Sequence, residues 1–299
     1  MTAMKRLPKP LKTILPLAII TATVAIIAYF FVKHPQIRHA LKTTNPWILV
    51  LLIALYAVFT ICLAAVYQAT LGLCGQQLKR QENLLLAAYS SVINFFGPLQ
   101  SGPGVRAAYL KQRHNIRLRD YTVATLVYYG IYAVLSVLFL FLGSHYWWAA
   151  IPLAVIAAIF SYMVIQMVIK RNKRKVTTSS LTFTSQSLGL LSLATLSQLV
   201  VQIIIYYVEL HALHVHASWW QAMSYSGAAN LALFVSLTPG AIGFRESFLL
   251  FSQKLHHIGT NTILAASIID RAAYVALLGI LCLVVVGFHA SKRFRPAAT

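Results

Sequence analysis

The residues best suited to chemistry lie in two interruptions of otherwise apolar sequence. Residues 236–246 have the sequence SLTPGAIGFRE. Residues 97–106, GPLQSGPGVR, are a degenerate repeat of the same motif. Both contain glycine, one further residue and an arginine: the shorter stretch ends with Arg106, and the longer one has Arg245 followed by Glu246. A glycine turn presents backbone N–H groups, a helix beginning there adds its positive end, and an arginine in its first turn adds a planar fork of donors. Both stretches therefore predict anion binding, with a phosphate headgroup as the natural ligand.

A second group of polar residues lies inside the neighbouring apolar segments. An asparagine follows a serine by four positions ahead of each interruption, as Ser90/Asn94 and as Ser226/Asn230. Charged residues inside membrane segments are costly and commonly functional. The alternative is that these groups only hold a helical bundle together through hydrogen bonds and ion pairs. The predicted substrate-binding residues are Arg245, Glu246, Gly240, Gly243, Asp270, Arg271, Asn230, Arg106, Asn94 and Glu209.

This predicted site centres on Arg245. We expect Arg245 and the backbone of Gly240–Gly243 to bind the phosphate of the cargo, while Asp270 holds Arg245 or Arg271 in place. Glu246 has two interpretations: it pairs with Arg245 and weakens the site, or it receives the amine of a zwitterionic or aminoacylated headgroup.

Neutral polar residues recur at the helical period in several segments, which predicts a polar interior away from lipid. One face carries Gln198, Gln202 and Tyr206 together with Glu209. Comparable faces are formed by Thr125, Tyr129, Tyr132 and Ser136, by Tyr56, Thr60 and Tyr67, and by Ser267, Asp270/Arg271 and Tyr274, the last of which also includes charged residues.

The composition requires a membrane as the surroundings of these residues. Hydrophobic residues make up 59% of the chain, charged residues 10%, and the mean hydropathy is +0.72. An ordinary soluble domain is about 25% charged. The formal net charge of +20 is explained by the positive-inside rule and by anionic lipid. No nucleic-acid partner is expected, because no soluble segment is long enough to carry such an interface.

The apolar segments predict an all-α polytopic membrane protein with about six full spans and two re-entrant broken helices. The chain is treated as a single transmembrane domain, 1–299, with halves at 47–142 and 188–288 and a basic cytoplasmic linker at 170–187. Opposite orientation of the halves would make an inverted-topology repeat, and two unrelated kinked regions are the alternative. The predicted spans are Leu15–Val32, Trp47–Leu73, Tyr121–Leu142, Trp147–Ile169, Leu188–Leu210 and Ile263–Phe288, and the predicted re-entrant segments are Leu84–Phe96 and Trp219–Leu237.

Other chemistry has little support in the sequence. There is no Walker loop, no nucleophile–base pair and no pair of carboxylates, so we expect no enzyme activity and no cofactor. Metal binding by loop histidines without an acidic partner is weakly supported, so we expect no metal site. The histidines concerned are His211, His214, His216, His256 and His257.

The motif at 238–246, TPGAIGFRE, followed by Asp270-Arg271 in the next span, resembles the lysylphosphatidylglycerol synthase transmembrane region. This is a flippase-like family of bacterial and archaeal membrane proteins, with a T/L-P-G-G-x-G-x-R-E-type motif and an acidic–arginine pair about one span later. The resemblance covers about Trp47 to Phe288. Ala241 stands where a glycine is usual, and Tyr129-Gly130 stands where the first half would carry an acidic–arginine pair.

The resemblance implies lipid translocation, or lipid handling, between leaflets. Full synthases also carry a soluble aminoacyl-transfer domain, and because this chain stops soon after its last span, synthase activity is not implied. We expect a flippase-like transporter of a phospholipid or polyprenyl-phosphate glycolipid in a prokaryotic cell membrane, with both termini cytoplasmic. Its expected partners are membrane lipids and anionic headgroups, with a homo-oligomer or a membrane enzyme partner left open. The alternatives are a secondary transporter of a small anionic solute and a non-transporting subunit of a glycosyltransferase or synthase complex.

Overall fold

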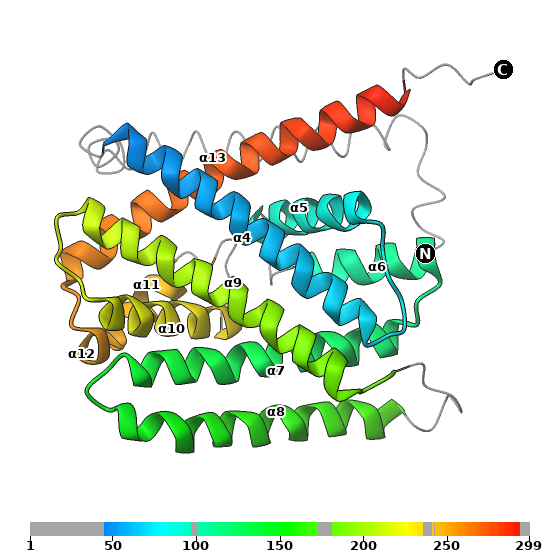
Figure 1. The fold of residues 1–299 in the computed structure, drawn as a ribbon, viewed down its shortest axis with the longest axis horizontal. Coiled ribbons are helices and arrows are strands. Elements are labelled where there is room, and N and C mark those ends of the chain that lie inside the picture. Colours follow the sequence, from blue (N-terminus) through cyan, green and yellow to red (C-terminus); the bar gives the residue numbers. More distant parts are fainter. Residues whose placement is uncertain (1–44, 97–100, 173–180, 236–240, 242, 294–299) are drawn as a thin grey trace. The chain divides into compact units, whose positions relative to one another are not determined.

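The computed structural model describes residues 45–96, 101–172, 181–235, 241 and 243–293 (Figure 1). Every element in these ranges is a helix. The first predicted span, Leu15–Val32, lies outside the described residues.

Within the described residues, five helices are long and apolar enough to cross a membrane. They coincide with five of the predicted spans, which confirms a multi-pass membrane protein. The apolar stretches are Pro46–Gly72 (α4), Leu118–Leu142 (α7), Trp147–Lys170 (the short η2, Trp147–Ala149, with most of α8, Ala150–Asn172), Ser185–Ala212 (α9) and Thr260–Leu283 (within α13, Thr260–Arg293).

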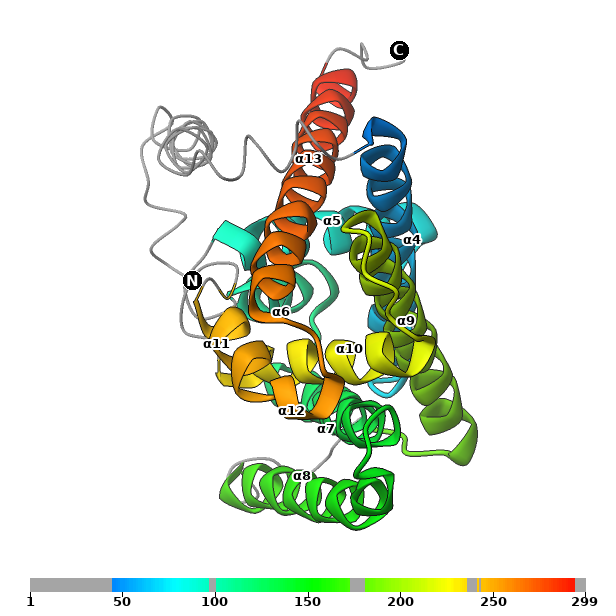
Figure 2. The same cartoon turned by 90° about the vertical axis from the view of Figure 1, so that its left-hand side faces the viewer.

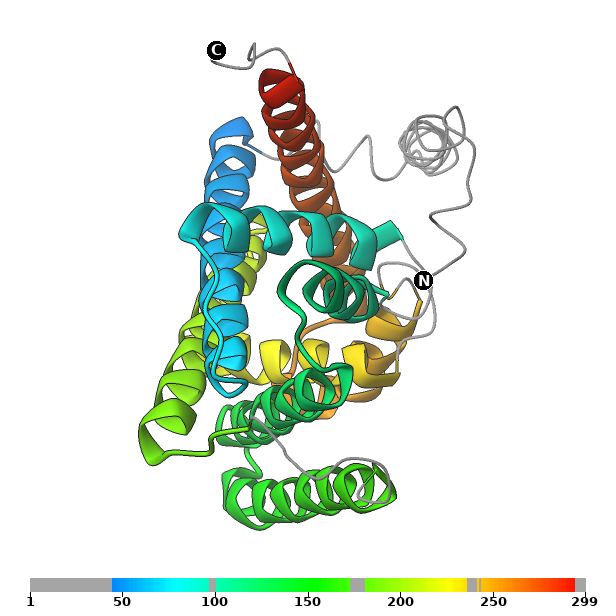
Figure 3. The same ribbon diagram turned by 90° about the vertical axis from the view of Figure 1, so that its right-hand side faces the viewer.

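The remaining helices are shorter and flank the interruptions. They are α5 (Arg80–Phe96), α6 (Gly102–His114), α10 (Trp219–Val235), α11 (Phe244–Phe251) and α12 (Gln253–His256). In Figures 1 and 3, α5 and α6 lie at one end of the bundle, whereas Figure 2 shows α11 and α12 at the opposite end. The predicted linker 170–187 includes the end of α8 and the start of α9, and 173–180 lie outside the described residues.

The long helices pack against one another in pairs, through faces made of small or apolar residues. α7 lies antiparallel to α8 on one side and packs against α10 on the other, while α4 packs along α9 (Figure 1). α8 turns large apolar side chains such as Ile151 and Phe160 outward, as a helix facing lipid does.

A glycine lets α10 approach α7 very closely. A Cβ added at Gly227 would lie 2.4 Å from the backbone nitrogen of Leu140, and the hydroxyl of Ser224 donates a 2.8 Å hydrogen bond to the carbonyl oxygen of Leu140. Small residues permit this backbone contact between membrane helices. The contact fixes α10, which carries Asn230 toward the interior.

The two interruptions differ in local structure. α11 begins at Phe244, directly after Gly243, whose φ of +85° favours glycine, so Arg245 stands in the first turn as predicted. α6 already begins at Gly102. The expectation that Gly104 is the turn and that Arg106 stands in the first turn is therefore wrong: Gly104 lies inside α6, and Arg106 is one turn further along.

Candidate functional site

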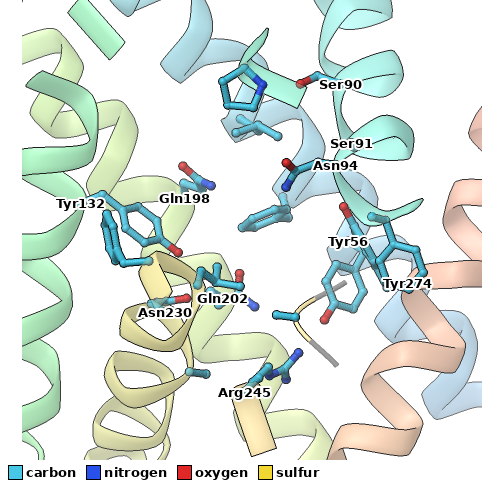
Figure 4. A pocket seen from close by; sticks show the side chains of 18 of the residues that line it. Tyr56, Ser90, Ser91, Asn94, Tyr132, Gln198, Gln202, Asn230, Arg245 and Tyr274 are labelled. Atoms are coloured by element: carbon cyan, nitrogen blue, oxygen red, sulfur yellow. The ribbon is translucent and has the colours of Figure 1, made fainter. Parts of the chain in front are cut away.

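A cavity of about 870 Å³ lies between the helices, and eight of them line it (Figure 4). The described lining residues come from α4, α5, α6, α7, α9, α10, α11 and α13, with Ala241 between α10 and α11. Both interruptions reach this cavity, because Gly104 and Arg106 line it from α6 and Arg245 lines it from α11.

Most of the polar lining is neutral. Tyrosine hydroxyls and the amides of glutamine and asparagine can both donate and accept hydrogen bonds. In Figure 4, Gln198, Gln202 and Asn230 lie near Tyr132 on one side, and Asn94 lies across the space from them. Members of each polar face predicted from the helical period therefore line this interior. Thr60, Thr125 and Ser136 are buried but not among the described lining residues, and they donate to carbonyl groups of their own helices. The neutral polar lining residues are Tyr56, Tyr67, Tyr128, Tyr129, Tyr132, Tyr206, Tyr274, Gln198, Gln202, Asn94, Asn230, Ser90, Ser91 and Ser101.

An ion pair between Arg245 and Asp270 joins α11 to α13. The Nη1 of Arg245 contacts the Oδ2 of Asp270, and the Tyr56 hydroxyl of α4 donates to the other carboxylate oxygen. The side chains of Arg245 and Asp270 are only 11% and 4% exposed. Asp270 was expected to hold Arg245 or Arg271, and its partner is Arg245.

A second ion pair, between Arg271 and Glu246, lies beside the first. Glu246 also accepts hydrogen bonds from the Ser267 hydroxyl and, at 2.8 Å, from the backbone N–H of Gly243. Glu246 thus caps the start of its own helix. Of the two interpretations of Glu246, pairing with Arg245 is wrong, because Glu246 pairs with Arg271 of α13 while Arg245 pairs with Asp270.

The backbone part of the predicted site is described only in part. The N–H of Gly243 is engaged with Glu246, and Gly240 lies outside the described residues. Ala241 is 4% exposed and has φ of +56°. A left-handed backbone at this position explains why a glycine would suit it.

Arg106 has a different environment from Arg245. It is 3% exposed, and its guanidinium carbon lies 3.6 Å from the centroid of the Tyr67 ring, a cation–π geometry. None of the ion pairs among the described residues includes Arg106. Its Nε and Nη1 make no hydrogen bond within the described part of the chain. Arg106 is therefore a buried donor group that lines the cavity and has no acidic partner in the described part of the chain.

Of the other predicted site residues, some line the cavity and one is buried outside its lining. Asn94 lines the cavity with an Oδ1 that has no described partner, and Asn230 lines it while donating a 3.3 Å bond to Ser226. Glu209 is fully buried, interacts electrostatically with Arg245 and is not among the described lining residues. The structure therefore brings together Arg106, Asn94, Asn230, Arg245, Asp270 and Arg271 and leaves Glu209 behind the lining.

Sequence reasoning did not assign a site role to Tyr56 or Tyr67. Tyr56 orients Asp270, and the Tyr67 ring supports the guanidinium of Arg106. Their helical spacing predicts that they share one face of a helix. It does not predict which charged residues of other helices contact that face.

Two polar clusters lie away from the cavity. Glu82 accepts from the Tyr109 hydroxyl at 2.6 Å and lies 2.7 Å from His114 Nε2, and these contacts hold the pKa of Glu82 below its ordinary value. His256 is fully buried, and burial lowers its pKa to about 4. Within the described ranges no group of three histidine, cysteine or acidic residues could hold a metal ion.

Fold and site together define a multi-pass helical membrane protein with a polar, partly charged cavity inside its bundle. The family model of the lysylphosphatidylglycerol synthase TM region matches residues 13–282. The chain therefore belongs to the lysylphosphatidylglycerol synthase TM-region family, which relates it to lipid handling. Neither a curated protein nor a solved structure matches it significantly.

Proposed function

We propose that the protein is a flippase-like transporter that moves a phosphate-containing lipid between leaflets. Its headgroup would enter the cavity while the acyl or prenyl chains stay among the helices. The proposal includes no chemical change of the lipid, a prokaryotic cell membrane as location, and cytoplasmic termini. Anionic lipids are the expected partners.

One observation carries this proposal: arginines from both interruptions present unused donors in the same interior cavity. Arg106 Nε and Nη1, and Arg245 Nε and Nη2, are buried and make no hydrogen bond within the described residues. A buried polar group without a partner is costly, whereas charge-assisted bonds from guanidinium to phosphate are strong and directional. A phosphate headgroup would satisfy these donors.

The arrangement of the short helices supports alternating access to that cavity. α5 and α6 come from one end of the bundle and α11 from the other (Figures 2 and 3), as expected for re-entrant helices of opposite orientation. Irregular backbone is tolerated at membrane depth where it lines a cavity, and transporters with inverted repeats bind cargo at the repeat interface. With the predicted span at Leu15–Val32, the chain would cross six times and return both termini to one side.

A cavity of about 870 Å³ also favours transport over a purely structural membrane subunit, whose interior would be filled. The test is flipping of a fluorescent phosphatidylglycerol in proteoliposomes, read by quenching of the label in the outer leaflet. We expect protein-dependent loss of leaflet asymmetry, strongly reduced by Arg245→Lys because the planar fork is lost. Equal rates in protein-free liposomes would refute the function.

A matched control separates binding from folding. Lys254 is exposed on α12, the helix that follows α11, and the variant Lys254→Gln should flip lipid at the normal rate. Detergent melting of each variant is measured alongside. If the loss of flipping in Arg245→Lys tracks an equal loss of stability, Arg245 has only a structural role.

A further inference from the structure

Resting on the proposed lipid transport, we infer that Glu209 is a proton-binding site that controls the affinity of the cavity for the cargo phosphate. While Glu209 is protonated, donors of Arg245 stay open to a phosphate. When Glu209 gives its proton to water, the electron pair of the O–H bond stays on the carboxylate. The carboxylate then competes with the cargo for Arg245, so that cargo and proton bind together.

The first step is the burial of Glu209 without a hydrogen-bond partner. This residue lies near the C-terminal end of α9 and is 0% exposed. Both of its carboxyl oxygens lack a partner within the described residues. A charged group in such surroundings is far more costly than a neutral one, and the carbonyl end of a helix is unfavourable for a negative charge. The geometry therefore fits a protonated Glu209 in this conformation.

The second step concerns the groups around Glu209. Arg245 of α11 interacts with it electrostatically, as do Tyr206 of α9 and Tyr225 of α10. The guanidinium carbon of Arg245 lies 5.0 Å from the centroid of the Tyr206 ring. The Nε and Nη2 of Arg245 and the hydroxyl of Tyr225 make no hydrogen bond within the described ranges. Unused donors and an unused acceptor therefore occupy the same buried region. The further titratable groups that contact this set are Asp270 of α13 with Tyr56 of α4, Tyr132 of α7, Glu246 of α11 and His256 of α12.

The third step is the charge balance of the interior. Three arginines line the cavity, and three carboxylates pair or interact with two of them; these groups are Arg106, Arg245 and Arg271, and Asp270, Glu246 and Glu209. When all of them are ionised, their charges cancel. A proton on Glu209 leaves one positive charge, which matches the single negative charge of a phosphodiester. Because linkage is reciprocal, a cargo that binds the protonated form more tightly also strengthens proton binding.

The fourth step is the competition for Arg245. Its Nη1 contacts Asp270, so Nε and Nη2 remain for one further anion. Carboxylate and phosphate both suit this planar fork of donors. The cavity-lining Gln202 and Tyr206 lie on the same face of α9 as Glu209. An ionised Glu209 at the end of this polar face would therefore take the donors that a phosphate in the cavity needs.

Proton-linked binding is measured on the purified protein. Dioctanoyl phosphatidylglycerol is titrated by calorimetry between about pH 5 and about pH 9, in two buffers of different ionisation enthalpy. We expect the affinity to be constant at low pH and to fall by up to about tenfold per pH unit at higher pH. In the falling range, binding should take up as much as about one proton per lipid. An affinity independent of pH, without proton uptake, would overturn the inference.

Two carboxylate variants assign the proton. Glu209→Gln cannot ionise and should bind the lipid at every pH as tightly as the parent does at low pH. Glu82→Gln removes a carboxylate from the cluster away from the cavity and should keep the profile of the parent. If Glu209→Gln fails to fold, Glu209→Asp retains an acid of shorter reach and should move the pH at which affinity falls. A profile identical to that of the parent in the folded Glu209 variant would refute the assignment.

Flipping assays separate this inference from the proposed function. Proton-linked binding without any flipping would refute the transporter and leave the proton site standing. Flipping together with binding that is independent of pH would support the transporter and refute the proton site. Soluble glycerophosphoglycerol that binds as tightly as the lipid, with the same proton uptake, would refute a lipid cargo and support Glu209 as the proton site.

Discussion

The ion pair between Arg245 and Asp270 gives a quantitative test of how this site is built. Both side chains are nearly buried, and Tyr56 donates to the same carboxylate. Asp270→Asn keeps the shape and an acceptor for Tyr56, yet leaves Arg245 charged and unpaired. Removing one partner of a buried pair costs about 3–5 kcal/mol. We expect that loss in the free energy of unfolding for Asp270→Asn, and a similar loss for Arg245→Gln.

The double variant Arg245→Gln/Asp270→Asn separates pairing from burial. It removes both charges, so most of the lost stability should return and the double variant should cost about 1 kcal/mol, which corresponds to a coupling free energy of at least about 5 kcal/mol. Lipid flipping should not return, because the guanidinium donors are absent. The assay is denaturant unfolding in detergent, with Lys254→Gln as an exposed control expected to stay within about 0.5 kcal/mol of the parent. Additive losses in the double variant would refute the pairing.

Three further predictions concern the scaffold around the cavity. Gly227→Ala should cost about 1–3 kcal/mol by forcing α10 from α7, whereas Gly189→Ala, with nothing within 4 Å, should be neutral or stabilising in thermal melts. The pKa of His256 lies near 4, below its ordinary 6.5, so the unfolded chain takes up the proton first. Stability should fall by about 3 kcal/mol as pH drops from 6.5 toward 4, and acid titration of His256→Gln should lack this component. Glu82→Gln should cost about 1 kcal/mol by weakening the bond from Tyr109. Because the pKa of Glu82 is lowered, the parent should lose this contribution as pH falls below about 4.5, whereas melts of the variant should not show that loss.

Much of this organisation could be predicted from the sequence because it depends on composition and period. Apolar runs of sufficient length located five spans, and the glycine before Phe244 located the start of α11. The helical spacing of Gln198 and Gln202 correctly placed them on an interior face. These features are local, so a single segment contains the information that determines them.

The pairing of charges could not be predicted in the same way. Arg245 and Arg271 both had a carboxylate within reach, and the choice depends on how α11 packs against α13, which no local pattern specifies. The surroundings of Arg106 depend likewise on Tyr67 from another helix. The prediction that a helix begins after Gly104 was also wrong, because α6 starts earlier, at Gly102, and contains Gly104 as an internal residue.

The most direct test of the central claim is an experimental structure of the protein in nanodiscs that contain phosphatidylglycerol. Our account predicts a headgroup inside the cavity, with its phosphate within hydrogen-bond distance of the Arg106 or the Arg245 guanidinium. The same structure of Arg106→Gln should show that density lost or weakened. Lipid density confined to the outer surface of the bundle, with none in the cavity of the parent protein, would contradict the account.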